Sequence, residues 1–243
     1  MLSFEPLYRR SSRSDESSTS RMLGDCANRR NRYRAGMIYR LDLSVASPDV
    51  GALAGKIGEH AITLVRNDDR LVPLGNLKLD ARIFNLAITN GDDRLWIANS
   101  FLAIMGNSGR KVETVVLDDR SSAAEVATTL ERADGADIVI ASLYGRVRTG
   151  QARSVGLPEP GAQALSALIA KKAPIIGISF GNPYLLQSFP NLRTYLVAYG
   201  DMPSLQQAAA RAVLGEIDIT GRLPISLPGL YPRRTGLQLK AQN

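Results

Sequence analysis

Short, continuous apolar runs recur along the chain from about residue 47 onward, and each has the length of one strand. They lie at 62–65, 81–88, 112–117, 137–142, 174–180 and 193–199. Apolar and polar positions do not alternate within them, which is typical of strands that are buried on both faces of a sheet. The pattern therefore predicts about five or six strands in a mostly parallel sheet.

Segments with helical signals separate most of these runs. They lie at 48–59, 94–106, 123–133, 159–173 and from Ser204 to just before Gly215. Ser122 with Glu125, and Ser204 with Gln207, have the spacing of N-terminal capping boxes. Asp92 or Asp93 is expected to cap the helix that follows the strand at 81–88. Alternating strands and helices predict an α/β fold, a doubly wound sandwich with helices on both faces.

Residues 1–40 differ from the rest of the chain because they are rich in Ser and Arg and show no apolar period. They hold nine arginines and no lysine against four acidic residues, so they carry +5 of the net charge of +7. Such a segment buries too little apolar surface to offset its ordering entropy. We predict a disordered, dispensable arm at 1–40 and a folded domain at 41–243. A nucleic-acid tether is the alternative for the arm, but no nucleic-acid-binding motif follows it.

Composition excludes several classes of protein. The single Cys26 allows no intrachain disulfide, and the single His60 excludes the Cys/His zinc frameworks. No stretch approaches the ~18 apolar residues of a membrane span, and the N-terminus has no signal-peptide pattern. We therefore expect no metal, no cofactor and no membrane partner.

One motif suggests nucleophilic catalysis. Gly177 to Gly181 match G-x-S-x-G after a predicted strand, which makes Ser179 a candidate nucleophile. No histidine follows Ser179, and a serine hydroxyl without a base is a poor nucleophile. Adjacent acids such as Asp118 and Asp119 form no convincing acid/base pair. We therefore assign no catalytic residue.

The segment 143–157 is longer than a connection from strand to helix requires, and long loops in compact domains tend to be functional. It follows a strand end, where open α/β sheets bind ligands. Its candidate binding residues are Arg146, Arg148, Gln151 and Arg153, whose donors suit sugar hydroxyls or the carboxylates of a neighbouring domain. In a surface loop, the substitutions Arg146→Ala and Arg148→Ala are expected to leave the melting temperature nearly unchanged.

Several motifs resemble one known family in order and spacing. Ile62–Asp68 and Leu71–Leu74 resemble the "TLLKN…LPL" start of the C-terminal domain of glycoside hydrolase family 3. Phe180–Tyr184 resembles a turn in its β-N-acetylhexosaminidase branch. Gly221–Pro228 resembles the "GRLPVSLP" end of that domain, and Tyr231–Leu237 fits its tail. The resemblance spans about residues 47–239.

This resemblance implies that the α/β sandwich works beside a barrel, which carries the aspartate nucleophile and most of the sugar pocket. In the β-glucosidase branch the acid/base glutamate lies on a sandwich loop, but the matching residues 146–154 contain no acid. In the hexosaminidase branch a barrel loop supplies the acid/base histidine and aspartate. Residues before Ser47 are too few for a barrel. The resemblance thus implies a β-N-acetylhexosaminidase/β-glucosidase type of activity that needs a barrel in trans or in a longer parent protein.

The alternative is a stand-alone carbohydrate-binding or protein-interaction module without catalysis. Both interpretations predict that the isolated chain is inactive, because neither of the two groups that glycoside hydrolysis requires can be placed in it.

Overall fold

The computed structural model describes residues 47–150 and 155–242. The chain divides into two compact units, residues 1–50 and 51–243, and the second unit carries the fold described below. The arm predicted at 1–40 lies outside the described residues.

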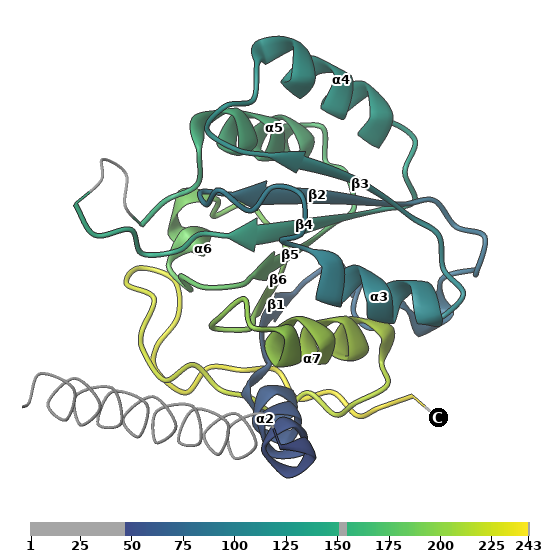
Figure 1. The fold of residues 1–243 in the computed structure, drawn as a ribbon, viewed down its shortest axis with the longest axis vertical. Coiled ribbons are helices and arrows are strands. Elements are labelled where there is room, and N and C mark those ends of the chain that lie inside the picture. The colour runs from purple at the N-terminus through teal and green to yellow at the C-terminus, as the bar shows by residue number, and fades with distance from the viewer. Residues whose placement is uncertain (1–46, 151–154, 243) are drawn as a thin grey trace, which may run out of the picture. The chain divides into compact units, whose positions relative to one another are not determined.

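A six-stranded sheet forms the centre of the second unit (Figure 1). Its strands are β1 (Thr63–Asn67), β2 (Ile83–Thr89), β3 (Val112–Leu117), β4 (Ile138–Tyr144), β5 (Ile175–Ser179) and β6 (Thr194–Val197). Their order is β1-β6-β5-β4-β2-β3, and all neighbours are parallel except β1 and β6. Every residue of β2, β4 and β5 is buried, as the continuous apolar runs predict.

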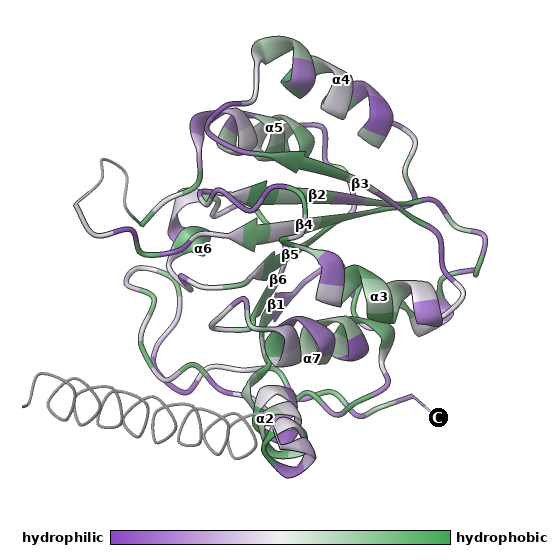
Figure 2. Ribbon diagram, viewed as in Figure 1, coloured by the Kyte–Doolittle hydropathy of each residue, from purple (hydrophilic) through white to green (hydrophobic). Residues whose placement is uncertain are grey.

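Helices cover both faces of this sheet, which confirms the predicted α/β fold. They are α2 (Pro48–Ala61), α3 (Asn99–Asn107), α4 (Ala123–Ala133), α5 (Glu159–Ala170), α6 (Leu185–Ser188) and α7 (Pro203–Leu214). Helices α3 and α7 pack together over one face, while α4 and α5 cover the other (Figure 1). Each face has its own cluster of buried apolar side chains, and Figure 2 shows the apolar strands between the helix layers.

Local sequence signals predict the ends of some helices correctly and those of others wrongly. The capping box of α4 is present, with the Glu125 amide donating to Ser122 Oγ at 3.2 Å and the Ser122 amide to Glu125 Oε2 at 2.8 Å. The capping box predicted at Ser204 is wrong: Met202 is the N-cap of α7, and Pro203 occupies the first helical position. Proline is favoured there because its φ is already helical and its missing N–H has no helical partner.

The start of α3 is also later than predicted. Backbone amides of Trp96 and Ile97 donate to the Asp93 carbonyl at 3.0 Å each, so residues 94–98 form turns before the helix begins at Asn99. Ala98 is the N-cap and has no side-chain cap. The prediction that Asp92 or Asp93 caps this helix is therefore wrong.

The residues after α7 run back along β1 and close that edge of the sheet. The Leu237 amide donates to the Leu64 carbonyl at 2.8 Å. A Cβ on Gly221 would lie 2.3 Å from the Ile62 carbonyl oxygen, so only glycine lets the two backbones approach this closely. In the part of the chain that the structure describes, no helix is long and apolar enough to cross a membrane.

Candidate functional site

The loop between β4 and α5 leaves the sheet where the strand order reverses. From β2 the chain crosses to β3 on one side, and then returns to β4 on the other side of β2. The last residues of β2 and β4, Thr89 and Tyr144, are neighbours in the register. Doubly wound sheets bind their ligands outside the carboxyl ends of the strands at such a switch point. The loop singled out from the sequence therefore lies at the position that this fold favours for a site.

Asn90 holds the base of this loop from the end of β2. Its Nδ2 donates to the Arg146 carbonyl at 2.8 Å and to the Gly156 carbonyl at 3.4 Å. Its Oδ1 accepts from the Arg146 amide at 3.1 Å. This buried amide side chain thus joins both ends of the loop, which fixes the direction in which the intervening residues leave the sheet.

Arg146 bridges two carboxylates that come from different strands. Its Nη2 lies 2.5 Å from Asp93 Oδ2, after β2, and its Nε lies 2.6 Å from Asp201 Oδ2, after β6. The hydrogen bond from Arg146 to Asp93 raises the pKa of the guanidinium further. Burial opposes ionisation of Asp93, but the hydrogen bond and charge of Arg146 outweigh it and lower the pKa of this carboxyl. Arg146 and Asp93 are therefore both charged at neutral pH.

The second loop arginine contacts the neighbouring loops instead. The guanidinium of Arg148 donates to the Asn90 carbonyl and lies 3.7 Å from Asp119 Oδ2, in the segment after β3. Arg146 and Arg148 together therefore link the segments that follow β2, β3, β4 and β6. Within the described residues, Arg146 Nη1 makes no hydrogen bond. Gln151 and Arg153 lie outside the described residues.

A third arginine, Arg94, connects the segment after β3 to the start of α4. Arg94 contacts Asp118 Oδ1 at 3.3 Å and Glu125 Oε1 at 2.6 Å. Asp118 is 2% exposed, and it also accepts two hydrogen bonds from the Arg120 side chain. Burial opposes ionisation of Asp118, but these arginines outweigh that effect and lower the pKa of its carboxyl.

The candidate nucleophile has a structural role. Ser179 is completely buried at the end of β5, and its hydroxyl donates to the Asn182 carbonyl at 2.8 Å. A buried hydroxyl that donates to a backbone carbonyl has no access to substrate. The serine-hydrolase interpretation is therefore not supported. Among the described residues, no group of three or more His, Cys, Asp and Glu side chains could hold a metal ion.

Sequence reasoning missed Asp201, the second partner of Arg146. Tyr199 adopts a φ of +64°, in the left-handed region, and Gly200 follows it. This turn at the end of β6 carries Asp201 to the loop at β4. The signal in the sequence was a Tyr-Gly-Asp run directly after an apolar strand, at the same sheet edge as the arginine-rich loop.

Exposed apolar side chains also lie in the segments that follow the carboxyl ends of these strands. Leu95, in the segment after β2, is 84% exposed, and Val147, after β4, is 72% exposed. Six such residues lie in the segments that follow β2, β4, β5 and β6: they are Leu95, Trp96, Val147, Val155, Tyr184 and Met202. We refer to these six residues as the apolar rim.

Comparisons with known proteins agree with the sequence motifs. No protein-family model matches the chain. A beta-N-acetylglucosaminidase/beta-glucosidase of Cellulomonas fimi is 24% identical over 189 residues, which cover 74% of this chain and 33% of that protein. The resemblance to glycoside hydrolase family 3 is confirmed.

Solved structures share the fold. A glycoside hydrolase family 3 beta-N-acetylglucosaminidase from Paenibacillus sp. str. FPU-7 is 21% identical with a TM-score of 0.56, over 74% of this chain and 33% of its own. A beta-glucoside phosphorylase bound to 2FGlc is 23% identical with a TM-score of 0.61, over 75% of this chain and 32% of its own. The chain thus spans about a third of the length of the relatives it matches, consistent with a C-terminal family 3 domain.

Proposed function

We propose that this chain is the C-terminal α/β domain of a family 3 glycosidase and acts on O-glycosyl bonds only together with a catalytic barrel. The apolar rim carries the proposal: its six exposed apolar residues all follow strands that end at one edge of the sheet, and exposed apolar surface of this kind marks a site that another protein surface covers. The match covers 33% of the Cellulomonas fimi protein, which leaves about two thirds of that protein for a partner domain. Their names indicate β-glucosides or β-N-acetylglucosaminides as the substrate class.

In this arrangement the loop after β4 contributes to binding and not to bond cleavage. Arg146, Arg148, Gln151 and Arg153 supply hydrogen-bond donors to sugar hydroxyls or to carboxylates of the barrel. Arginine cannot exchange a proton at neutral pH, so the loop offers charge and hydrogen bonds only. The two ion pairs of Arg146 support this role, because they hold the base of the loop in one position, while Nη1 makes no hydrogen bond to the described residues.

Co-purification tests the proposal. The chain is co-expressed with a tagged family 3 barrel, and the tag is used to isolate the barrel. We expect the wild-type chain to co-purify and the Trp96→Asp variant to be lost, because a carboxylate would be buried in an apolar contact. Leu79→Asp is the matched control, since Leu79 is equally exposed but lies before β2, away from the carboxyl edge.

Two results would contradict the proposal. The first is a wild-type chain that never co-purifies with any family 3 barrel tested, which would favour a stand-alone module. The second is equal loss of Trp96→Asp and Leu79→Asp, which would show that the apolar rim has no special part in assembly.

A further inference from the structure

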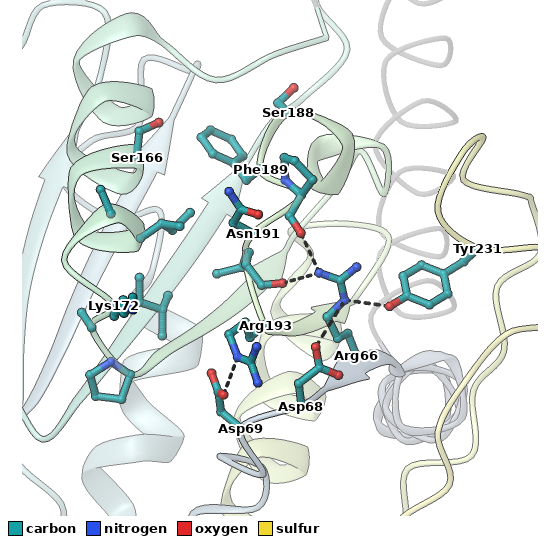
Figure 3. A pocket seen from close by; sticks show the side chains of 17 residues that line it. Arg66, Asp68, Asp69, Ser166, Lys172, Ser188, Phe189, Asn191, Arg193 and Tyr231 are labelled. Atoms are coloured by element: carbon teal, nitrogen blue, oxygen red, sulfur yellow. Dashed lines mark hydrogen bonds and ion pairs between the residues drawn. The ribbon is translucent and has the colours of Figure 1, made fainter.

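A groove of about 1040 Å³ lies at the opposite edge of the sheet, beside the first residue of β5 and the segment that leads into β6 (Figure 3). The last turns of α5 and the turn to β5 form one wall, and the segment Ser188–Arg193 forms the other. Its volume is in the range of small-molecule sites. The candidate site described above lies at the carboxyl ends of the strands, so this groove is a separate feature.

Arg66 builds the groove by linking three parts of the chain. Its side chain is 15% exposed, and Nη1 donates to the Pro190 carbonyl at 2.7 Å and to the Leu192 carbonyl at 3.1 Å. Its Nε donates to the Tyr231 hydroxyl at 2.7 Å, and its guanidinium carbon lies 5.4 Å from the centre of that ring (Figure 3). β1, the segment before β6 and the C-terminal residues are thus fixed to one another. A groove with fixed walls loses little entropy when a ligand binds.

The charges that line the groove are nearly balanced. Arg193 pairs with Asp69 at 2.6 Å, and Asp68 lies 4.0 Å from Arg66. Lys172 is the remaining lining cation, which leaves a formal charge of +1 on the lining. An arrangement that places carboxylates beside its arginines does not favour a phosphate or sulfate ligand, because the carboxylates would repel it.

Four polar side chains of the groove have no partner within the described residues. They lie on both walls and comprise Ser166, Lys172, Ser188 and Asn191. Hydroxyl and amide groups both donate and accept hydrogen bonds, while the ammonium of Lys172 only donates. The groove also has an accessible apolar surface, because its lining residues Ile169, Ala170 and Pro190 are partly or fully exposed. Mixed donors and acceptors beside an apolar surface fit a ligand that carries many hydroxyls on an apolar ring.

We propose that this groove binds a neutral oligosaccharide, and that the chain therefore has a carbohydrate site of its own at the amino edge of the sheet. The proposal does not depend on a barrel, so the proposed function can fail while this inference stands, and the reverse is equally possible.

Amide-resolved NMR titration of the full chain tests this site, with cellobiose and N,N′-diacetylchitobiose as probes and inorganic phosphate as the anionic comparison. We expect at least one sugar to shift the amides of 166–173 and 188–193, while phosphate leaves them unchanged. Lys172→Gly and Asn191→Ala are expected to weaken sugar binding at least about fivefold. Both sites are exposed, and thermal melts of each variant verify that the fold is retained.

Arg70→Gly is the matched control for Lys172→Gly. Both residues are exposed cations with a positive φ, +54° for Arg70 and +56° for Lys172, so glycine relieves the same backbone strain at each. Arg70 does not line the groove, and we expect its variant to bind like the wild type. The proposal is overturned if neither sugar shifts the groove amides, if phosphate alone does, or if Arg70→Gly weakens binding as much as Lys172→Gly.

Discussion

At the scale of single residues, Arg146 shows how the position of a side chain changes its expected role. A loop arginine is ordinarily solvated, and its removal then has little effect on stability. Here the guanidinium is 32% exposed and lies between Asp93 and Asp201, which come from the ends of two different strands. Its loss would leave two partly buried carboxylates without their cation. This geometry argues against an unchanged melting temperature for the Arg146→Ala variant.

We predict that Arg146→Ala lowers the free energy of unfolding by about 1–3 kcal/mol, the usual effect of leaving charged, partly buried hydrogen-bonding groups unsatisfied. Chemical denaturation of the full chain measures this difference. Arg132→Ala is the control, because Arg132 and its partner Glu113 are both more than 40% exposed. A pair of that kind contributes less than about 1 kcal/mol. Equal effects of the two variants would show that Arg146 is an ordinary surface residue.

At the scale of secondary-structure elements, the sequence predicts those features that depend on residues close together in the chain. The apolar runs give all six strands. Strands β2, β4, β5 and β6 are buried throughout, as expected of strands covered on both faces. The prediction of burial is wrong for the edge strand β3, in which only Leu117 is buried. The bounds of β3 are predicted correctly, and the ends of the other five strands are off by one or two residues, since hydrogen bonds to adjacent strands set them. The Ser122 capping box is correct because all of its bonds are local. At Ser204 the same spacing is overridden by Pro203, which starts the helix two residues earlier than a cap at Ser204 would.

The candidate site likewise has features that the sequence predicts and features that only the structure shows. The length and arginine content of the loop after β4 are visible in the sequence, and so is its place at a strand end. Its bonds to Asn90, Asp93 and Asp201 are not, because they join segments that are about 55 residues apart. Only the strand order shows that β2, β4 and β6 end at one edge.

The two predicted capping boxes allow a direct test at this scale. We expect Ser122→Ala to reduce the free energy of unfolding by about 1 kcal/mol, because the Glu125 amide would lose its acceptor at the start of α4. Ser204→Ala should change it by less than about 0.5 kcal/mol, since that hydroxyl makes no hydrogen bond within the described residues. Thermal unfolding of both variants gives the comparison. A larger loss from Ser204→Ala would mean that the hydroxyl caps α7 after all.

At the scale of the whole molecule, three carboxyl groups at the carboxyl edge of the sheet are unsuited to proton donation. A glycosidase general acid needs a raised pKa so that it is protonated at neutral pH. At this edge the carboxyl pKa values of Asp93, Asp118 and Glu125 are all lowered. For Glu125 the hydrogen bond from the Ser122 backbone is the main cause, followed by Arg94. These carboxylates therefore hold loops together as anions.

We predict accordingly that the pure chain does not hydrolyse aryl β-N-acetylglucosaminides or aryl β-glucosides. Continuous release of the chromogenic aryl alcohol measures turnover, and a complete family 3 enzyme at the same concentration serves as the positive control. Cleavage with retention needs one carboxyl as acid and a second group as nucleophile on either side of the bond, and Asp93, Asp118 and Glu125 at this edge are bound to arginines. Sustained turnover that a single substitution in this chain abolishes would contradict the prediction. Loss of that turnover through Ser179→Ala in particular would restore the serine as a nucleophile, against its burial and its bond to the Asn182 carbonyl.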